Sequence, residues 1–457
     1  MKKLPMTRTQ FLKILFASTF AFSTKSLVSQ ERNKKEVIII GAGIAGLAAA
    51  RKLSIEGFQV TILEARNRIG GRVWTDNSMG LPIEMGAGFI EGKDNPIRKL
   101  IDQFKLSVKE FPLEDMELFD SKGNTIDNVD NEKIQKLYNI FLKKLHLMKN
   151  SLSKEKSLAE AKDIILSEMV FSEEERDSLN LAISSNLENR YGTNLKNISL
   201  QYSDEKNFST DSMSIPTEGF SLVINNLSKE LNIKTSHIVS KIEYDKKVKI
   251  STNHGEFTAD YVLVTVPLGV LKKKKIEFIP ELPENKKIAI QNLGFGTINK
   301  LFFKFPQKFW SSDTKRFRLI SQTKKGFIEF WNVNSSSDAP ILSTILSGEQ
   351  AINLETRNKK EIISESMYGL RKIFGPKTQT PIEIQVSKWH SDPFSFGTSS
   401  YLTIHSEPES YNVMAEPIND LVFFAGEGTN NMNPNSLQGA FLSGEREANR
   451  IIALNRA

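Results

Sequence analysis

Three glycines and one glutamate form the pattern in this sequence with the clearest chemistry. Gly41, Gly43 and Gly46 follow the spacing GxGxxG, and Glu64 stands 23 residues after Gly41. In such a pattern the first glycine permits a tight turn, the second lets the backbone approach a pyrophosphate, and the third lets a helix pack closely against a strand. The acid accepts hydrogen bonds from ribose hydroxyls. The spacing predicts a dinucleotide-binding site and leaves the choice between NAD and FAD open.

The residues around these glycines predict the elements that must hold them. Residues 36–40 (EVIII) are a short apolar, β-branched run, residues 44–53 are rich in alanine and leucine, and residues 59–63 form a second strand-like run that ends at Glu64. This order predicts a strand, a glycine turn, a helix and a second strand, which together make a βαβ unit. The start of the helix would present unpaired N–H groups and the positive end of its dipole to the phosphates.

The remaining segments predict an α/β protein assembled from two discontinuous domains. Residues 93–205 contain few glycines and read as helical, with apolar side chains at helical spacing between residues 134 and 148. Strands are predicted at residues 233–266, 297–305, 326–346 and 421–425, and a helix at residues 437–454. Strand-rich segments therefore stand at both ends and in the middle of the chain.

The strand at residues 297–305 carries a lysine of interest. Alternation places Lys300, Phe302 and Lys304 on one face of the strand and three apolar side chains on the other. From this pattern alone, Lys300 reads as a solvated residue of an edge strand.

The residues after the second predicted strand carry a family resemblance. Residues 64–72 (EARNRIGGR) resemble the signature of the flavin-containing amine oxidases, the monoamine and polyamine oxidase-like flavoproteins. Further matches are found at residues 83–92 (IEMGAGFIEG), 217–220, 237–242, 259–271, 276–283, 389–393, 424–429 and 438–444. The resemblance implies FAD as the cofactor and a two-domain fold, in which a Rossmann-type FAD domain is joined to a substrate domain of mixed sheet and helices. It implies an FAD domain from residues 35–92, 210–290 and 390–457, and a substrate domain from residues 93–209 and 291–389.

The resemblance also assigns cofactor-binding residues. They are Gly41, Gly43, Ala45, Gly46, Glu64, Ala65, Arg66, Gly71, Arg72, Gly86, Ala87, Val239, Trp389, Gly426, Glu427 and Leu437. A guanidinium of the signature would neutralise the pyrophosphate, whereas Arg68 reads as part of a solvated basic turn. Glu427 would serve the ribityl–phosphate end, and the helix after Leu437 would point its N-terminus at the isoalloxazine. Trp389 would line the flavin pocket, although a buried tryptophan is also common in an ordinary core.

Two residues are implied as catalytic. Lys300 matches the family lysine that holds a water near flavin N5, where a cation would stabilise negative charge on the reduced flavin. Glu91 stands where polyamine-oxidising relatives place a Glu or His at the substrate tunnel, and a carboxylate there would attract a protonated amine. A surface loop acid is the alternative interpretation of Glu91. The two aromatic side chains that usually frame the amine are replaced, in the best register, by Ser399 and Ser436.

The resemblance implies FAD-dependent oxidation of a monoamine or a polyamine. Hydride would pass from the carbon next to nitrogen to flavin N5, water would hydrolyse the imine, and O₂ would be reduced to H₂O₂. An L-amino-acid oxidase is one alternative, and it needs an arginine for the substrate carboxylate, for which Arg190, Arg316 and Arg318 are available. A flavin dehydrogenase of the same superfamily and a flavin-binding protein without oxidase turnover are the others.

The composition narrows the way in which the flavin is held. The 457 residues include no cysteine, and the five histidines lack metal-ligand spacing, so no metal is predicted. Since a thioether link to cysteine is impossible, the FAD should be bound non-covalently.

The first 29 residues explain most of the positive charge. They contain five basic residues and no acid, and an apolar run at residues 14–22 predicts a signal peptide and export to the periplasm or the medium. If the segment is kept instead as an amphipathic helix, a cytoplasmic location is expected. Without it, 56 basic residues face 54 acidic ones, so the formal charge falls from +7 to +2. The small remaining charge predicts no nucleic acid as a partner, and no membrane span is predicted in the mature protein. The four lysines at residues 272–275 read as a solvated turn. The partners that the family resemblance implies are an amine and O₂.

Overall fold

The computed structural model describes residues 34–92, 94–112, 115–149, 155–203, 213–320, 327–332 and 339–456. The predicted signal peptide, residues 1–29, lies outside the described residues. Residues 36–457 form one compact unit. Within the described residues, no helix combines the length and the apolar character needed to cross a membrane.

A five-stranded parallel sheet carries the glycine turn. Its strand order is β22 (Val422–Phe424), β13 (Tyr261–Val264), β1 (Glu36–Ile40), β2 (Gln59–Leu63) and β9 (Asn232–Lys234). Helix α2 (Ile44–Ile55) connects β1 to β2, so the predicted βαβ unit is confirmed. The strands are almost continuously apolar because both faces of the sheet are covered.

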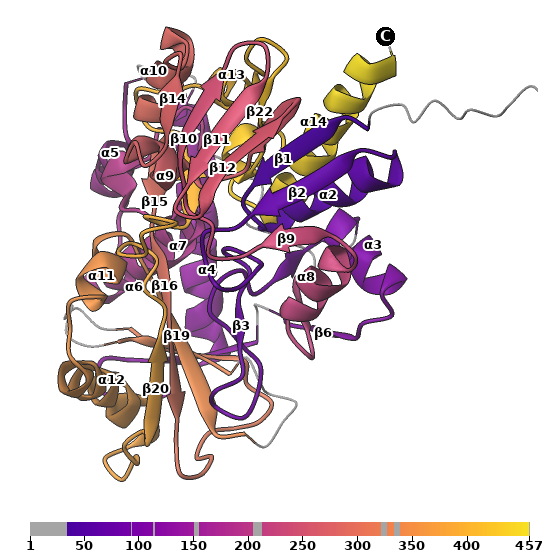
Figure 1. Cartoon of the computed structure of the whole chain (residues 1–457). Helices are drawn as coiled ribbons and strands as arrows, with labels where there is room; N and C mark the ends of the chain where they lie inside the picture. Colours follow the sequence, from indigo (N-terminus) through magenta and orange to yellow (C-terminus); the bar gives the residue numbers. More distant parts are fainter. Residues whose placement is uncertain are drawn as a thin grey trace, which may run out of the picture. The chain divides into compact units, whose positions relative to one another are not determined.

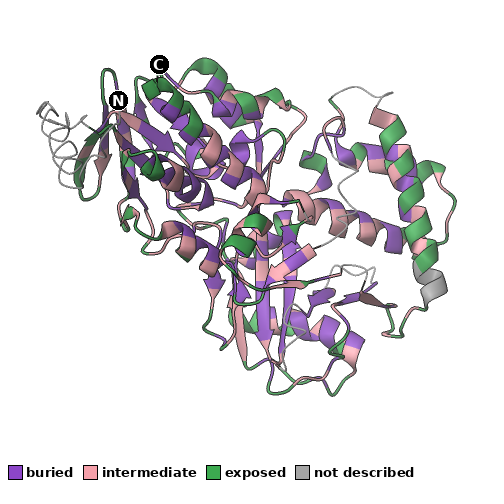
Figure 2. Cartoon of the chain, turned by 90° about the vertical axis from the view of Figure 1, so that its right-hand side faces the viewer, coloured by how far each residue is buried: buried purple, intermediate pink, exposed green. Residues whose placement is uncertain are grey.

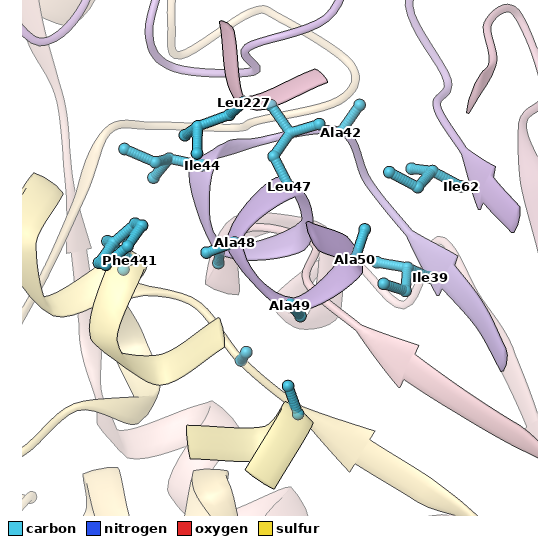
Figure 3. Close-up of a cluster of buried hydrophobic side chains, with 14 of the residues drawn as sticks. Ile39, Ala42, Ile44, Leu47, Ala48, Ala49, Ala50, Ile62, Leu227 and Phe441 are labelled. Carbon is cyan, nitrogen blue, oxygen red and sulfur yellow. The ribbon is translucent and has the colours of Figure 1, made fainter. Parts of the chain in front are cut away.

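Two helices cover one face of this sheet. α2 packs against α14 (Leu437–Arg456), and Figure 1 shows the two side by side next to β1 and β2. Ile39, Leu47 and Phe441 belong to the hydrophobic cluster that joins the helices to the sheet (Figure 3). A Cβ on Gly444 would lie 2.1 Å from the main-chain oxygen of Ala45, so the close approach of the helices requires glycine there.

The opposite face packs on a second cluster and a smaller sheet. This four-stranded sheet has the order β12 (Gly255–Ala259), β11 (Val248–Thr252), β10 (Val239–Tyr244) and β14 (Glu277–Ile279). Ile38 and Ile40 of β1 point into this cluster, whereas Val37 and Ile39 point into the first one. Helices α9 (Leu268–Lys272), α10 (Glu284–Asn292) and α13 (Glu409–Ala415) complete this region.

A six-stranded sheet forms a separate layer from the five-stranded parallel sheet that carries the glycine turn. Its order is β20 (Glu383–Val386), β16 (Ile298–Lys304), β19 (Ile341–Ser347), β18 (Glu329–Trp331), β17 (Arg316–Leu319) and β7 (Met116–Phe119). Leu301 and Phe303 are fully buried in a core that also takes side chains from α11 (Gly348–Leu354) and α12 (Lys359–Phe374), so the predicted alternation along residues 297–305 is confirmed. β16 is flanked by β19 and β20, so the expectation that Lys300 lies on an edge strand is wrong.

The helical segment contains strands that the sequence pattern did not predict. β7 joins the six-stranded sheet and β6 (Val108–Glu110) pairs with β8 (Met213–Pro216), so residues 93–205 are not helical throughout. The helices there are α3 (Pro96–Gln103), α4 (Asn128–Lys149), α5 (Leu158–Glu168), α6 (Glu173–Ile183) and α7 (Asn189–Tyr191), with a π-helical turn at Ser184–Glu188 and a 3₁₀ turn at Leu195–Asn197. Capping boxes start α5 at Ser157 and α6 at Ser172.

Short elements connect these parts. They are β3 (Thr75–Asp76) with β4 (Ile83–Glu84), β5 (Ile90–Glu91) beside β8, β15 (Gly294–Gly296) with β21 (Ser399–Tyr401), helix α8 (Ser221–Ser228) and a 3₁₀ turn at Glu427–Thr429. Figure 2 shows buried residues concentrated in the strands and on the inward sides of the helices. The residue bounds of the two predicted domains stay a prediction, and the described part of residues 36–457 forms a single compact unit.

Candidate active site

A large cavity lies between the carboxyl ends of the parallel strands and the six-stranded sheet. Its volume is about 1980 Å³, which exceeds the range typical of small-ligand pockets, roughly 300–1000 Å³. Its lining includes all of the site residues implied by the sequence except Gly46, together with Ser399 and Ser436. Residues spread from Gly41 to Leu437 therefore meet at one place, although their individual roles stay predictions.

The glycine turn is shaped for a phosphate. Gly41 has a φ of +107°, which disfavours any other residue, and a Cβ on it would lie 2.7 Å from Oγ1 of Thr265. A Cβ on Gly46 would lie 2.1 Å from the main-chain oxygen of Gly41, so this glycine allows α2 to lie close to β1. No atom lies within 4 Å of the corresponding position on Gly43, which faces the cavity. This geometry is compatible with the three predicted roles, which are a tight turn at Gly41, space for a pyrophosphate at Gly43 and close packing of the helix at Gly46.

Glu64 is buried at the end of β2 and holds two loops together. Its Oε2 accepts a hydrogen bond from the N–H of Ala42 at 2.8 Å, and its Oε1 accepts one from the N–H of Arg66 at 2.8 Å. The carboxylate thereby joins the glycine turn to the following basic segment while it lines the cavity. The guanidinium of Arg66 forms an ion pair with Asp392 at 2.6 Å.

The expectation that Arg68 belongs to a solvated turn is wrong. Its guanidinium donates to the main-chain oxygens of Ile69 and Gly71, at 3.3 and 2.9 Å, and lies 4.6 Å from the ring centroid of Trp74. Burial, followed by the charge of Arg66, lowers the pKa of Arg68 to about 10. This arginine fixes the shape of the loop rather than facing water.

Arg72 and Glu427 form the centre of a second group. Nη1 of Arg72 lies 2.9 Å from Oε1 of Glu427 and also donates to the main-chain oxygen of Thr398. The other oxygen of Glu427 accepts from the hydroxyl of Ser400 at 2.5 Å and from its N–H at 3.2 Å. Sequence reasoning did not identify Ser400, whose only signal was its place in the segment next to Ser399.

A second glycine loop and a tryptophan form another wall. A Cβ on Gly86 would lie 1.8 Å from the main-chain oxygen of Arg72 and 3.3 Å from the ring of Trp389. The indole N–H of Trp389 donates to the main-chain oxygen of Met85 at 2.9 Å, and its ring meets Trp74 edge to face. Trp389 is buried and lines the cavity, so it belongs both to the core and to the pocket wall.

Lys300 projects from the middle of β16 toward the second glycine loop. Its Nζ donates to the main-chain oxygen of Glu84 at 3.0 Å and lies 5.9 Å from the ring centroid of Phe89. A Cβ on Gly88 would lie 2.5 Å from this Nζ, so a glycine makes room for the ammonium group. Burial lowers the pKa of Lys300 to about 8, and the carboxylate of Glu84 partly opposes that shift.

Glu84 is a functional candidate that sequence reasoning missed. Its Oε1 accepts from the N–H of Phe220 and the hydroxyl of Thr75, both at 2.8 Å. Its Oε2 is buried without a hydrogen-bond partner among the described residues. Burial raises the pKa of Glu84 above its usual range, while these hydrogen bonds and Lys300 oppose the shift. Glu84 belongs to the family match at residues 83–92, but nothing in the sequence distinguished this acid.

The remaining candidates lie around the cavity in different settings. Glu91 is exposed at the end of β5 and lines the cavity, and its role stays a prediction. The hydroxyl of Ser436 caps α14, since it accepts from the N–H of Gly439 at 2.9 Å and donates to the main-chain oxygen of Asn433 at 2.8 Å. Ser399 is buried in β21 and lines the cavity, so both serines lie on its wall.

The lysine run at residues 272–275 is only partly the solvated turn that was expected. Nζ of Lys272 donates to the main-chain oxygens of Ile290, Gln291 and Leu293 at 2.6–2.8 Å, where α10 ends. Burial lowers the pKa of Lys272 to about 8. The next three lysines are exposed, and Lys275 reaches the cavity wall. Lys272 therefore satisfies carbonyl groups at a helix end.

The residues present fit FAD. The backbone at Gly43 leaves room beside the start of α2, as a pyrophosphate requires, and the carboxylate of Glu64 stands at the end of the next strand. Arg72 offers positive charge on the same wall, and α14 begins at Leu437 on the cavity. In the described part of the chain, no group of three or more His, Asp or Glu side chains is placed to hold a metal ion.

Comparison with known proteins relates this arrangement to a family. Residues 44–452 match the family model described as flavin containing amine oxidoreductase. The chain is 34% identical over 445 residues to lysine-specific histone demethylase 1 homolog 2 of Arabidopsis thaliana, covering 93% of this chain and 59% of that protein. It is 31% identical over 448 residues to probable polyamine oxidase 4 of Arabidopsis thaliana, covering 94% of this chain and 90% of that protein.

A solved structure agrees in fold. Putrescine oxidase bound to putrescine superposes with a TM-score of 0.74 at 20% identity, covering 92% of this chain and 99% of the other. This likeness shows the two-domain flavoprotein fold. The chain spans between 30% and 59% of the length of the histone demethylases that it matches. With a family match over most of the chain, the protein belongs to the flavin-containing amine oxidoreductase family.

Proposed function

We propose that this protein is an FAD-dependent amine oxidase that acts on a monoamine or a polyamine and releases H₂O₂. The observation that carries the proposal is the position of Lys300, whose ammonium group enters the wall of a cavity that also contains the glycine turn and Glu64. Bound FAD would supply the hydride acceptor for the carbon next to the substrate nitrogen and would return the electrons to O₂.

The chain's own residues would bind the nucleotide and hold a charge near the reacting atoms. The glycine turn and Glu64 hold the dinucleotide, while Arg72 and Glu427 fix a second part of the wall. Lys300 carries its proton below about pH 8, where its positive charge favours negative charge developing nearby, and its N–H groups orient a water for imine hydrolysis. An amine that is neutral on binding would need no strong base.

The substrate end would select amines by charge. Glu91 lies on the cavity wall with an exposed side chain, and a carboxylate there attracts a protonated amine before it reaches the interior. Relatives named polyamine oxidase and a neighbour named putrescine oxidase support an amine substrate. A steady-state assay of H₂O₂ and aldehyde release with mono-, di- and polyamines tests the proposal. Equal amounts of both products support it, and no product from any amine contradicts it.

We also propose that the enzyme is exported after removal of residues 1–29. The proposal is supported by the absence of acids and the apolar run in that segment. N-terminal sequencing of the native protein tests it, and an intact Met1 would contradict it.

A further inference from the structure

One face of the six-stranded sheet lines the cavity across four neighbouring strands. Lys300 pairs with Ile345, and Arg318 pairs with Glu329. Extending the Trp331–Ser343 pair by two residues aligns Glu329 with Ile345, so Lys300 and Arg318 lie in one cross-strand row. Residues in such a row share a face of the sheet. At about 4.8 Å per strand, three strand steps separate the backbones of Lys300 and Arg318 by roughly 14 Å.

Arg318 lies in the buried part of this wall. It is 6% exposed, and its Nε and Nη2 both contact Oε2 of Glu329, at 2.9 and 2.8 Å. Arg316 makes the matching contacts with Oε1, at 3.2 and 2.8 Å, so each oxygen of Glu329 serves one arginine. These contacts with Glu329 engage Nε and Nη2 of Arg318 and not Nη1, and Arg318 lines the cavity. A guanidinium has five N–H donors, and a buried donor without an acceptor is energetically unfavourable.

A second donor lines the cavity. The hydroxyl of Tyr138, on α4, makes no hydrogen bond of standard length among the described residues, its weaker interaction being with the side chain of Asn186, and the residue is 4% exposed. Burial raises the pKa of Tyr138 to about 12, so its hydroxyl is a donor at neutral pH. Tyr138 lines the cavity, and the positive charge of Arg318 acts to lower the pKa of its hydroxyl. The side-chain amide of Asn186 lines the cavity as well.

We propose that Arg318 and Tyr138 form an anion subsite that binds a carboxylate on the amine substrate. This inference rests on the proposed amine oxidation. A guanidinium and a hydroxyl are both donors, and the pairing of a guanidinium with a carboxylate is strong and directional. Because Arg318 and Lys300 lie three strand steps apart, with β19 and β18 between them, the carboxylate must be joined to the amine by a spacer. An α-amino acid carries both groups on one carbon and cannot reach both ends. The substrate class is therefore an ω-amino carboxylic acid or a longer amine that ends in a carboxylate.

The test compares matched ligands on the FAD-loaded enzyme. Anaerobic flavin reduction is titrated with 4-aminobutanoate, 6-aminohexanoate and 8-aminooctanoate, with hexylamine as the ligand that lacks a carboxylate and leucine as the α-amino acid. Calorimetric binding of hexanoate measures the subsite without any reaction. The variants are Arg318→Gln and Glu329→Gln, and Arg318→Lys serves if the first variant fails to fold.

Wild-type enzyme is expected to bind at least one of the longer amino carboxylates roughly tenfold or more tightly than hexylamine, because a charged hydrogen bond is added. Arg318→Gln should remove that difference and weaken hexanoate binding while leaving the apparent affinity for hexylamine within about twofold. Arg318→Lys keeps the charge but loses the paired donors of the guanidinium, so it should reduce the difference and the hexanoate affinity without abolishing them. Glu329→Gln should strengthen hexanoate binding, since it removes the competing carboxylate. No preference for amino carboxylates, no hexanoate binding, or an equal loss for both ligand types would overturn the subsite. If no amine reduces the flavin but hexanoate binds through Arg318, the proposed amine oxidation has failed and the subsite stands.

Discussion

The ammonium nitrogen of Lys300 donates to the main-chain oxygen of Glu84 at 3.0 Å, while Oε2 of the same Glu84 is buried without a hydrogen-bond partner among the described residues. Lys300, whose pKa is lowered, lines the cavity, and its ammonium group contacts Glu84, whose buried carboxyl has a raised pKa. Their charges favour each other, and burial disfavours both. Such a pair is typical of a functional site.

Replacing Lys300 with Met should slow one flavin half-reaction. Methionine keeps the length of the side chain and removes the charge near the reacting atoms. We expect reduction or reoxidation of the flavin to slow by roughly 100-fold, the usual effect of removing one stabilising donor. Stopped-flow measurement of both half-reactions checks this. Unchanged rates in both would remove Lys300 from the mechanism.

The pH dependence of the Lys300-dependent step should report the lysine itself. Its folded pKa is lowered to about 8, so the charge is present below about pH 8 and is lost above it. The half-reaction that depends on the charge should therefore decline as the pH rises through about 8. Glu84→Gln removes a nearby negative charge that raises this pKa, so the decline should move to lower pH.

The exposed acid Glu256, which pairs with Lys249 on the surface, provides the matched control. Glu256→Gln should leave the pH profile in place. A profile that is the same in wild type, Glu84→Gln and Lys300→Met would contradict the assignment to Lys300.

Two alanine substitutions in the glycine turn should separate folding from cofactor binding. Gly46→Ala places a Cβ 2.1 Å from a main-chain oxygen and should lower the free energy of unfolding by about 1–3 kcal/mol. Gly43→Ala meets no atom within 4 Å and has φ −74° at this position, so the change in stability should stay within about 1 kcal/mol. Its methyl group would instead enter the space for the pyrophosphate, and FAD affinity should fall roughly tenfold or more. Chemical denaturation and FAD titration check the pair, and equal effects on both properties would refute the assignment.

The flavin should leave the protein on denaturation. Because the chain has no cysteine, no thioether link to cysteine can form, and we propose that the FAD is held non-covalently. After acid precipitation, essentially all of the flavin absorbance should remain in the supernatant. Flavin retained in the washed pellet would show a covalent link through another residue.

Much of the fold was predictable because its signals are local. The run EVIII, the glycine spacing and Glu64 specify β1, α2 and β2 within a short stretch of chain. The alternation along residues 297–305 predicted the two faces of β16 correctly. It did not show that β16, which carries Lys300, is paired on both sides, because an edge strand and a central strand can have the same alternation. β7 was missed because its pairing partner, β17, lies about two hundred residues later in the sequence.

The site was predictable to the extent that glycines and acids carry recognisable spacing. The contacts of Glu84, Ser400 and Arg318 depend on side chains that meet only after folding. The prediction for Arg68 was wrong for the same reason. Nothing in the sequence shows that the main-chain oxygen of Gly71 and the ring of Trp74 surround its guanidinium.

The central claim is that this cavity oxidises amines with bound FAD, and anaerobic reduction of the flavin tests it most directly. The purified protein should show an oxidised flavin spectrum, and that spectrum should bleach on addition of at least one amine from a panel of monoamines, diamines, polyamines and ω-amino carboxylates. Readmission of O₂ should restore the spectrum with release of H₂O₂. A bound flavin that no amine in the panel reduces would contradict the proposed function.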